Sequence, residues 1–272
     1  MIDCGEGTQI SLKILGWGLK NLDVICFTHF HADHILGLPG LLLTIGNYGR
    51  VEPLYIIGPS NIKNIVKDLC SIAPEIPFEL IVIEQDYFAE NIFELHNFSI
   101  DILPVDHSLD CLAYKINLPQ KGKFDLKKAE SLDLPKPFWS KLQCGENVEY
   151  HGKIFTPQMV LGRERKGIKI CYCTDSRPTD DLINFVHDSD LFVCEGIYGE
   201  DEKLDKAILK KHMIFSEAAT IAQKANVKEL WLTHFSPSMP HPEEYLSFAS
   251  DIFANTIVAH DRISKTIYFS DK

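Results

Sequence analysis

Residues 28–34 read Thr-His-Phe-His-Ala-Asp-His and place four potential metal ligands within six positions. The apolar run at 24–27 is typical of a strand, so we expect the ligands on the loop that ends this strand. No regular helix or strand can aim all four side chains at one ion, whereas a loop can divide them between two ions. Imidazole nitrogens suit Zn²⁺, and a carboxylate can bind metal or hold a water molecule. The candidate ligands are His29, His31, Asp33 and His34.

Three further candidates each follow an apolar, strand-like run elsewhere in the chain. Taken singly, each would more often be a capped turn or a surface histidine than a ligand. Rigid sheets position the loops that carry chemistry, however, and together with the first loop these residues bring the set to five His and two Asp. Such a set suffices for two ions, a bridging carboxylate and an open position for water, and it predicts a hydrolytic site; the alternative is a chance cluster of histidines. The three candidates are His107, Asp175 and His234.

Length and composition are those of an ordinary globular protein. The 272 residues are 45% hydrophobic and 24% charged, and no apolar run approaches the ~20 residues that a membrane span needs. The N-terminal residues lack the basic and apolar regions of a signal peptide. The eight cysteines contain no C-x-x-C pair, and several lie in strand-like runs. We therefore predict a reduced, cytoplasmic protein that does not associate with membranes.

The charge is unevenly distributed along the chain. A net charge of −11 argues against an indiscriminate nucleic-acid binder. Residues 121–170, however, hold eleven Lys or Arg against six Asp or Glu. This basic stretch is explained either as a solvated surface or as a contact for a polyanion, and the second explanation gains weight only from the neighbouring site.

Short apolar strands alternate with amphipathic helical stretches throughout the chain, which indicates an α/β fold. Consecutive strands around 79–116 argue against a purely parallel sheet, so we expect two mixed sheets with helices outside them. We predict a single domain over residues 1–272, with an arm-like excursion at about 117–165 that is rich in Lys, Pro and Gly. Strands are expected at 23–27, 54–57, 79–83, 100–105, 111–116, 168–173, 191–194, 229–233 and 256–259, and helices at 35–46, 60–71, 179–187, 216–225 and 242–253.

Several motifs, in order from residue 3 to the C-terminal region, give the chain its resemblance to a known family. It resembles ribonuclease Z, the tRNA 3′-processing endonuclease of the metallo-β-lactamase superfamily. The resemblance implies a metallo-β-lactamase-like αββα sandwich of two mixed sheets flanked by helices, and a homodimer. The motifs are Asp-Cys-Gly-Glu-Gly-Thr-Gln at 3–9, the histidine loop at 28–34, Gly-Leu-Pro-Gly-Leu-Leu at 37–42, Gly-Pro at 58–59, Val-Asp-His-Ser at 105–108, Thr-Asp-Ser-Arg-Pro at 174–178, His212 before Glu-Ala-Ala at 217–219, and Leu-Thr-His-Phe-Ser-Pro at 232–237.

The resemblance also implies a role for each candidate residue. Two Zn²⁺ per subunit, with Mn²⁺ as the alternative metal, would be held by two sets of ligands that share Asp175 as a bridge. Asp33 would both bind metal and orient the attacking water, or accept its proton. His212 would protonate the leaving 3′ oxygen while Glu195 orients it; otherwise these two form a surface histidine and a salt bridge. The implied sets are His29, His31 and His107 for one ion, and Asp33, His34 and His234 for the other.

The chain departs from the family pattern in three places. It begins two residues before the first motif, where the family carries strands, so its first sheet is expected to lack edge strands. The family's His-Glu-Ala-Thr segment is matched by Cys-Glu-Gly-Ile at 194–197, which keeps only the acid. The tip of the arm, at 134–139, keeps its prolines without the glycine. There Lys136 and Trp139 would either contact the nucleic acid or form a hydrophobic staple that holds the arm.

Three functional hypotheses follow from these observations. The leading one is a zinc-dependent endoribonuclease, a phosphodiesterase that removes 3′ trailers from precursor tRNA and leaves a 3′-hydroxyl. The second is a metal-dependent hydrolase of small phosphodiesters or sulfate esters. The third is an N-terminally truncated, inactive remnant. The complete ligand set argues against the third, because buried charged ligands without metal would destabilise the fold.

Overall fold

The computed structural model describes residues 1–72, 75–85 and 92–270. The chain divides into two compact units. The first is formed by Met1–Asn117 and Lys169–Thr266, and the second by Leu118–Ile168 together with the C-terminal residues from Ile267. Within the described residues, no helix combines the length and the apolar character that crossing a membrane requires.

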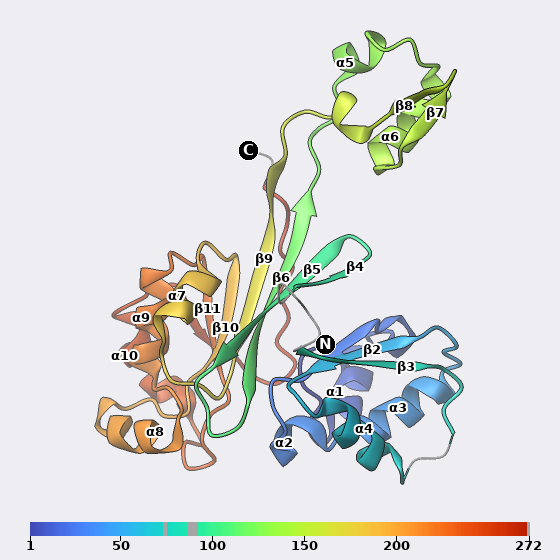
Figure 1. The fold of residues 1–272 in the computed structure, drawn as a ribbon. Helices are drawn as coiled ribbons and strands as arrows, with labels where there is room; N and C mark the ends of the chain where they lie inside the picture. The colour runs from blue at the N-terminus through green and yellow to red at the C-terminus, as the bar shows by residue number, and fades with distance from the viewer. Residues whose placement is uncertain (73–74, 86–91, 271–272) are drawn as a thin grey trace. The chain divides into compact units, whose positions relative to one another are not determined.

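The first unit begins with a sheet of three parallel strands in the order β1-β2-β3. The chain passes through helices between successive strands and returns to the same end of the sheet, which makes the pairing parallel. Residues 1–3 run along β1, where Met1 and Asp3 form backbone hydrogen bonds with Cys26. The elements are β1 (Val24–Cys26), β2 (Leu54–Gly58), β3 (Leu80–Glu84), α1 (Thr8–Leu15), α2 (Ala32–Ile35), α3 (Leu38–Asn47) and α4 (Ile62–Cys70), and all but β1 are labelled in Figure 1.

A second sheet of seven strands completes the first unit, in the order β12-β11-β10-β9-β6-β5-β4. Strands β9 to β12 run parallel to one another, whereas β4, β5 and β6 form an antiparallel meander. The strands are β4 (Ile92–Leu95), β5 (Phe98–Val105), β6 (Cys111–Gln120), β9 (Arg165–Cys173), β10 (Leu191–Glu195), β11 (Leu230–Thr233) and β12 (Thr256–Val258). The helices that accompany them are α7 (Asp180–Val186), α8 (Leu204–Lys210), α9 (Phe215–Lys224) and α10 (Ser247–Ser250).

Buried side chains define four layers in the first unit. Ile57 of the first sheet shares a core cluster with Ile100 and Tyr114 of the second, and the Tyr114 hydroxyl donates to the carbonyl of Phe27 at 2.6 Å. Helices α3 and α4 cover the other face of the first sheet, and α7 and α9 cover that of the second. The predicted αββα sandwich is confirmed. One detail differs, because β1, β2 and β3 are all parallel and only the seven-stranded sheet is mixed.

The second unit has a small core of its own. Leu134, Leu142 and Val148 are buried together, and aromatic side chains surround them. Asp125 caps the first helix, because its carboxylate accepts hydrogen bonds from the amides of Lys127 and Lys128 at 3.1 and 3.2 Å. The stretch at about 117–165, predicted as an arm-like excursion, therefore contains regular elements. They are α5 (Leu126–Glu130), α6 (Trp139–Cys144), β7 (Val148–Tyr150) and β8 (Lys153–Phe155).

The helices differ from the predicted pattern in places where tertiary contacts determine where a helix begins or ends. The helix expected over 35–46 is divided at Gly37, where a Cβ would lie 2.0 Å from the carbonyl oxygen of Gly5. The helix expected over 242–253 is shortened to α10, because the part that begins at Pro242 is a 3₁₀ turn. Helix α1 has no fully buried residue, and Leu12 packs only partly buried against the core, so the sequence gives a weak helical pattern there.

A buried arginine joins the segments that lead into β1 and β2. The Arg50 side chain is 2% exposed. Its guanidinium group donates to four backbone carbonyls, and the ring of Phe78 lies 6.0 Å away. Because these carbonyls lie in the segments that precede β1 and β2, their shared contact with one cation holds the starts of the two strands together. The acceptors are the carbonyls of Lys20, Leu22, Glu52 and Pro53, at 2.5–2.8 Å.

We expect the substitution Arg50→Ala to lower the free energy of unfolding by about 3 kcal/mol, because it leaves buried carbonyls without a donor. Urea titration followed by circular dichroism measures this loss. Arg163→Ala removes an exposed arginine of the second unit and serves as the control. Equal midpoints for the two variants would contradict the assigned role.

Candidate metal centre

The candidate ligands meet at one edge of the sandwich. The loop at 28–34 follows β1, Asp175 follows β9, and His234 follows β11. Glu195 is the last residue of β10, and His107 lies in the connection between β5 and β6. The carboxyl ends of parallel strands are where α/β folds assemble their sites, because the sheet fixes each loop.

Four side chains form the first donor group: His29, His31, His107 and Asp175. One ligand atom from each lies within 4.8 Å of the others. His29 Nε2 is 2.8 Å from His31 Nδ1 and 3.3 Å from Asp175 Oδ2. His107 Nε2 is 3.7 Å from the same carboxylate oxygen. The structure thus brings together the residues assigned to one ion and the carboxylate assigned as the bridge.

A second donor group consists of Asp33, His34 and His234, again within 4.8 Å of one another. His34 Nε2 lies 3.5 Å from Asp33 Oδ2 and 3.8 Å from Asp175 Oδ2. His234 Nδ1 is 3.2 Å from Asp175 Oδ1. Asp175 therefore contacts both groups. The Asp33 side chain is 71% exposed, so its carboxylate lies on the solvent side of the site.

Asp3 orients two of these histidines from behind. Its carboxylate accepts hydrogen bonds from the Thr28 amide at 2.7 Å, the Thr28 hydroxyl at 2.8 Å and His34 Nδ1 at 2.8 Å. The Thr28 hydroxyl, in turn, lies 3.0 Å from His29 Nδ1 and can accept a hydrogen bond from it. Holding the outer nitrogen in this way fixes the tautomer and leaves Nε2 of each ring free to face the site.

Asp3 was not predicted as a site residue. The motif at 3–9 indicated the family. It lies too far along the chain from the histidine loop for residue spacing to predict a contact between the two. The contact is formed because residues 3–5 pack tightly against the loop. Cys4 donates its amide to the His34 carbonyl at 2.7 Å, and a Cβ on Gly5 would lie 2.1 Å from the Asp33 carbonyl oxygen.

His107 is oriented by a different element. Its Nδ1 lies 3.1 Å from the carbonyl oxygen of Lys211, just before α9. The Lys211 ammonium group bonds back to Asp106 Oδ1 at 2.7 Å and to the His107 carbonyl at 3.2 Å. Lys211 was also missed by sequence analysis, since its backbone rather than its side chain makes the contact with the ring.

Two of the candidate ligands have a backbone conformation that residues other than glycine rarely adopt. Asp175 has φ 50° and His234 has φ 56°, both in the left-handed region. Each follows the end of a parallel strand by one or two residues, and the turn directs the side chain into the cluster. Such conformations persist where the surrounding structure enforces them, and they are frequent at functional sites.

The arrangement of the buried donor atoms matches metal binding better than it matches hydrogen bonding among the donors themselves. Among the described residues, His107 Nε2 and His234 Nδ1 are buried atoms without a hydrogen-bond partner. Both face Asp175, and His29 Nε2 faces another ring nitrogen. Buried polar atoms are almost always satisfied, so an inward-facing set of unpaired nitrogens and carboxylate oxygens matches what a divalent ion requires.

The charges within the cluster shift its acid–base equilibria strongly. Contact with His234 lowers the pKa of Asp33 to about 2. Burial acts to lower the pKa of His234, but the nearby carboxylates of Asp33 and Glu195 outweigh it and raise the pKa to about 10. Burial likewise acts to raise the pKa of Asp175, but hydrogen bonding from His29 and the nearby imidazoles bring it well below the usual range. Without metal, the cluster therefore holds protons between its carboxylates.

His212 and Glu195 also lie together beside the cluster. His212 Nδ1 is 2.8 Å from Glu195 Oε2, and the Glu195 carboxylate is fully buried. The ring of His212 is 5.2 Å from that of His107 and 5.8 Å from that of His234, measured between centroids. A buried carboxylate that accepts from one ring nitrogen leaves the other available for proton transfer to a substrate.

Comparisons with known proteins agree with this architecture. A family model described as the metallo-β-lactamase superfamily matches residues 1–63. Among solved structures, the short form of human tRNase Z superposes with a TM-score of 0.66 at 23% identity, covering 98% of this chain and 88% of that chain. This similarity shows that the two share a fold.

Curated relatives are much closer in sequence. Ribonuclease Z of Clostridium acetobutylicum is 54% identical over 276 residues, covering 100% of this chain and 89% of the relative. Ribonuclease Z of Clostridium kluyveri is 55% identical over 271 residues with the same coverage. Both matches cover the whole of this chain, including the sheets and the second unit. This chain therefore belongs to the ribonuclease Z family of the metallo-β-lactamase superfamily.

Proposed function

We propose that this chain is a zinc-dependent endoribonuclease that removes 3′ trailers from precursor tRNA and leaves a 3′-hydroxyl. One observation carries the proposal: a protein named ribonuclease Z is 54% identical over the whole of this chain. The donor groups support it, because a cluster of five histidines and two aspartates suits a metal-dependent hydrolase.

We propose two Zn²⁺ per subunit, with Mn²⁺ as a substitute. His29, His31 and His107 would hold one ion, the second donor group would hold the other, and Asp175 would bridge them. The donors are imidazole nitrogens and carboxylate oxygens, a set that suits Zn²⁺ in sites with an open position. When bound, the metals would supply Lewis acidity that lowers the pKa of the attacking water and stabilises charge on the phosphate.

The remaining chemistry is assigned to three side chains. Asp33 lies exposed at the solvent side of the site, with a pKa lowered to about 2. It would accept a hydrogen bond or a proton from the attacking water as a carboxylate. His212 would donate a proton to the departing 3′ oxygen, and Glu195, fully buried beneath it, would orient the ring and stabilise its charged form.

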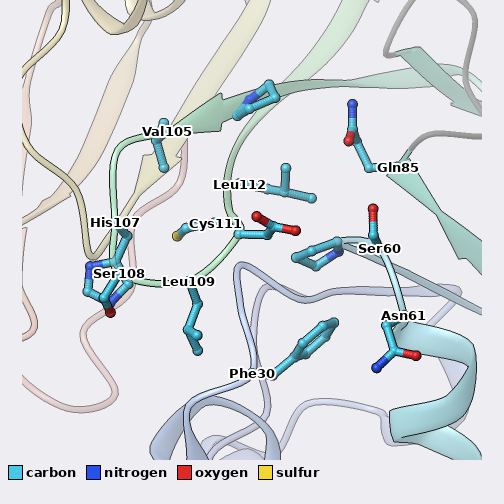
Figure 2. A pocket seen from close by; sticks show the side chains of 13 residues that line it. Phe30, Ser60, Asn61, Gln85, Val105, His107, Ser108, Leu109, Cys111 and Leu112 are labelled. Carbon is cyan, nitrogen blue, oxygen red and sulfur yellow. The ribbon is translucent and has the colours of Figure 1, made fainter.

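A cavity of about 680 Å³ opens beside this centre and offers room for a nucleotide. Its lining includes His107, and Figure 2 shows Phe30, Asn61 and Leu109 around it. A planar ring and a side-chain amide are groups that can stack against and hydrogen-bond a base. The cavity therefore favours a nucleic-acid substrate over a small ester, which would leave most of this volume unused.

The second unit would contribute to tRNA binding by charge. The basic stretch at 121–170 covers nearly all of this unit, and Lys127, Lys128 and Lys141 are exposed on it. Trp139 is half-buried and donates its Nε1 hydrogen to the carbonyl of Leu134 at 3.1 Å, so it serves as a staple within the unit. Lys136 remains exposed above its ring, at 5.8 Å, where it can meet a phosphate.

We also propose a homodimer in which α1 forms the contact between the subunits. Ile10 and Ile14 lie one turn apart on α1 and are 58% and 64% exposed, and Trp17, just beyond the end of the helix, is 58% exposed. Large apolar side chains exposed on a helix without buried residues are typical of a surface that another protein covers. A cytoplasmic location would suit the protein, because its cysteines are free and most of them are buried.

Processing of a precursor tRNA with a 3′ extension tests the function directly. With Zn²⁺ bound, we expect a single cut after the discriminator nucleotide. Asp175→Asn should reduce the rate at least about 10³-fold, because it removes the shared carboxylate, whereas Asp205→Asn, an exposed residue of α8, should leave the rate unchanged. Hydrolysis of bis(p-nitrophenyl) phosphate without tRNA cleavage would instead support the small-ester hydrolase, and inactivity towards both would support the remnant.

Zinc binding should release protons and strengthen with rising pH. The pKa of His234 in the metal-free site is raised to about 10, so its imidazole is protonated at pH 7 and must lose that proton to bind metal. We expect affinity to increase by up to about tenfold per pH unit below that pKa. Titration calorimetry in two buffers of different ionisation enthalpy counts the protons. His187→Gln, at an exposed site, should behave as the wild type, and a pH-independent affinity would refute the assignment.

If α1 forms the subunit contact, Ile14→Asp should convert a dimer to a monomer at micromolar concentration, because it places a charge in an apolar interface. Sedimentation velocity measures the change. Ile154→Asp alters an equally exposed isoleucine of the second unit and should not change the mass. A wild-type protein that sediments as a monomer would contradict the proposal.

A further inference from the structure

Arg177 makes a set of contacts that the proposed reaction does not yet use. It lies two residues after Asp175, and its side chain is 17% exposed. Nη1 donates to the carbonyl of His212 at 2.5 Å and to Glu217 Oε2 at 2.9 Å, while Nη2 donates to Glu217 Oε1. The guanidinium group therefore holds a backbone carbonyl and a carboxylate at once, with two parallel bonds to the carboxylate.

Glu217 transmits this contact to the backbone next to His212. The same carboxylate oxygen that binds Arg177 accepts a hydrogen bond from the amide of Ile214 at 3.1 Å. Residues 212–214 are thus fixed from both sides, by Arg177 at the His212 carbonyl and by Glu217 at the Ile214 amide. Since Lys211 is bound to His107, the peptide that carries His212 has little freedom to move.

The segment that carries Arg177 also holds the partner of His212. The amide of Ser176 donates to Glu195 Oε1 at 2.6 Å, and Glu195 Oε2 is bonded to the His212 ring. Residues 175–177 therefore provide the bridging carboxylate, the anchor for Glu195 and the anchor for His212 in sequence. This arrangement sets where the imidazole lies relative to the metal-binding carboxylate.

We propose that Arg177 is a positioning residue, which aligns His212 for proton donation through its bonds to the His212 carbonyl and Glu217. The inference rests on the proposed function. In that reaction the oxygen of water bonds to phosphorus, and its proton passes to Asp33. The bond between phosphorus and the 3′ oxygen breaks with its electron pair on that oxygen, which takes a proton from His212. Arg177 touches neither substrate nor water and acts only through the position of the donor.

Two substrates separate this role from a purely structural one. Precursor tRNA loses a poor leaving group that needs a proton, whereas bis(p-nitrophenyl) phosphate loses a phenolate that leaves without one. We expect Arg177→Ala to lower kcat for precursor tRNA about 10²-fold with little change in KM. Hydrolysis of the nitrophenyl ester should fall no more than about threefold. Arg177→Lys should resemble Arg177→Ala, because an ammonium group cannot make two parallel bonds to the carboxylate.

Lys115→Ala provides a matched control. It breaks an ion pair with Asp101 at 2.9 Å whose side chains are 20% and 22% exposed, close to the values for Arg177 and Glu217. Neither rate should change in this variant. A further check combines Arg177→Ala with His212→Ala, and the double variant should be no slower on precursor tRNA than His212→Ala alone.

Three results would overturn the proposal. They are equal losses on both substrates, no loss on either, and a further loss in the double variant. A lower melting temperature with equal losses would identify a merely structural role. Failure of the wild-type protein to cleave precursor tRNA while it hydrolyses the nitrophenyl ester would instead reject the proposed function, and that result is visible before any variant is made.

Discussion

The carboxylate of Asp3 holds together the part of the molecule on which the site depends. It binds the amide and hydroxyl of Thr28 and the ring of His34, and through the hydroxyl it reaches His29. These bonds fix the histidine loop to the end of β1 and determine which nitrogen of each ring faces inward. The tight approach of Gly5 to the loop belongs to the same constraint, since any side chain there would separate the two segments.

The rest of the site is organised by outer contacts of the same kind. Lys211 orients His107 through its carbonyl, and Ser176 holds Glu195 through its amide. Backbone groups therefore do much of the positioning, and the side chains that face the centre are left with unpaired nitrogens and oxygens. Their mutual proximity is electrostatically costly unless protons or metal ions lie between them, which couples metal binding to the stability of the loops.

Much of the fold could be predicted because its signals are local. Apolar runs such as 54–57 and 191–194 form strands that a short stretch of sequence is enough to predict. The candidate ligands could be predicted because they follow such strands. Helix α1 was missed because it has no buried residue, and the helix at 35–46 was predicted as continuous because the contact between Gly37 and Gly5 is invisible in sequence. The order within the second unit was missed because its core is assembled from scattered apolar residues.

By itself, the sequence determined the chemical identity of the donors, the α/β class and the family, since residue types, periodicity and motif order are properties of the chain read in one dimension. The tertiary structure alone decided the contacts between distant segments: Asp3 behind the histidines, Lys211 behind His107, and Arg177 behind His212. The physical reason is that the contacts at Lys211 and Arg177 use backbone carbonyls, which every residue carries, and that the Asp3 carboxylate meets a loop far from it along the chain. Only the three-dimensional path of the chain decides which of those groups meets a given ring or carboxylate.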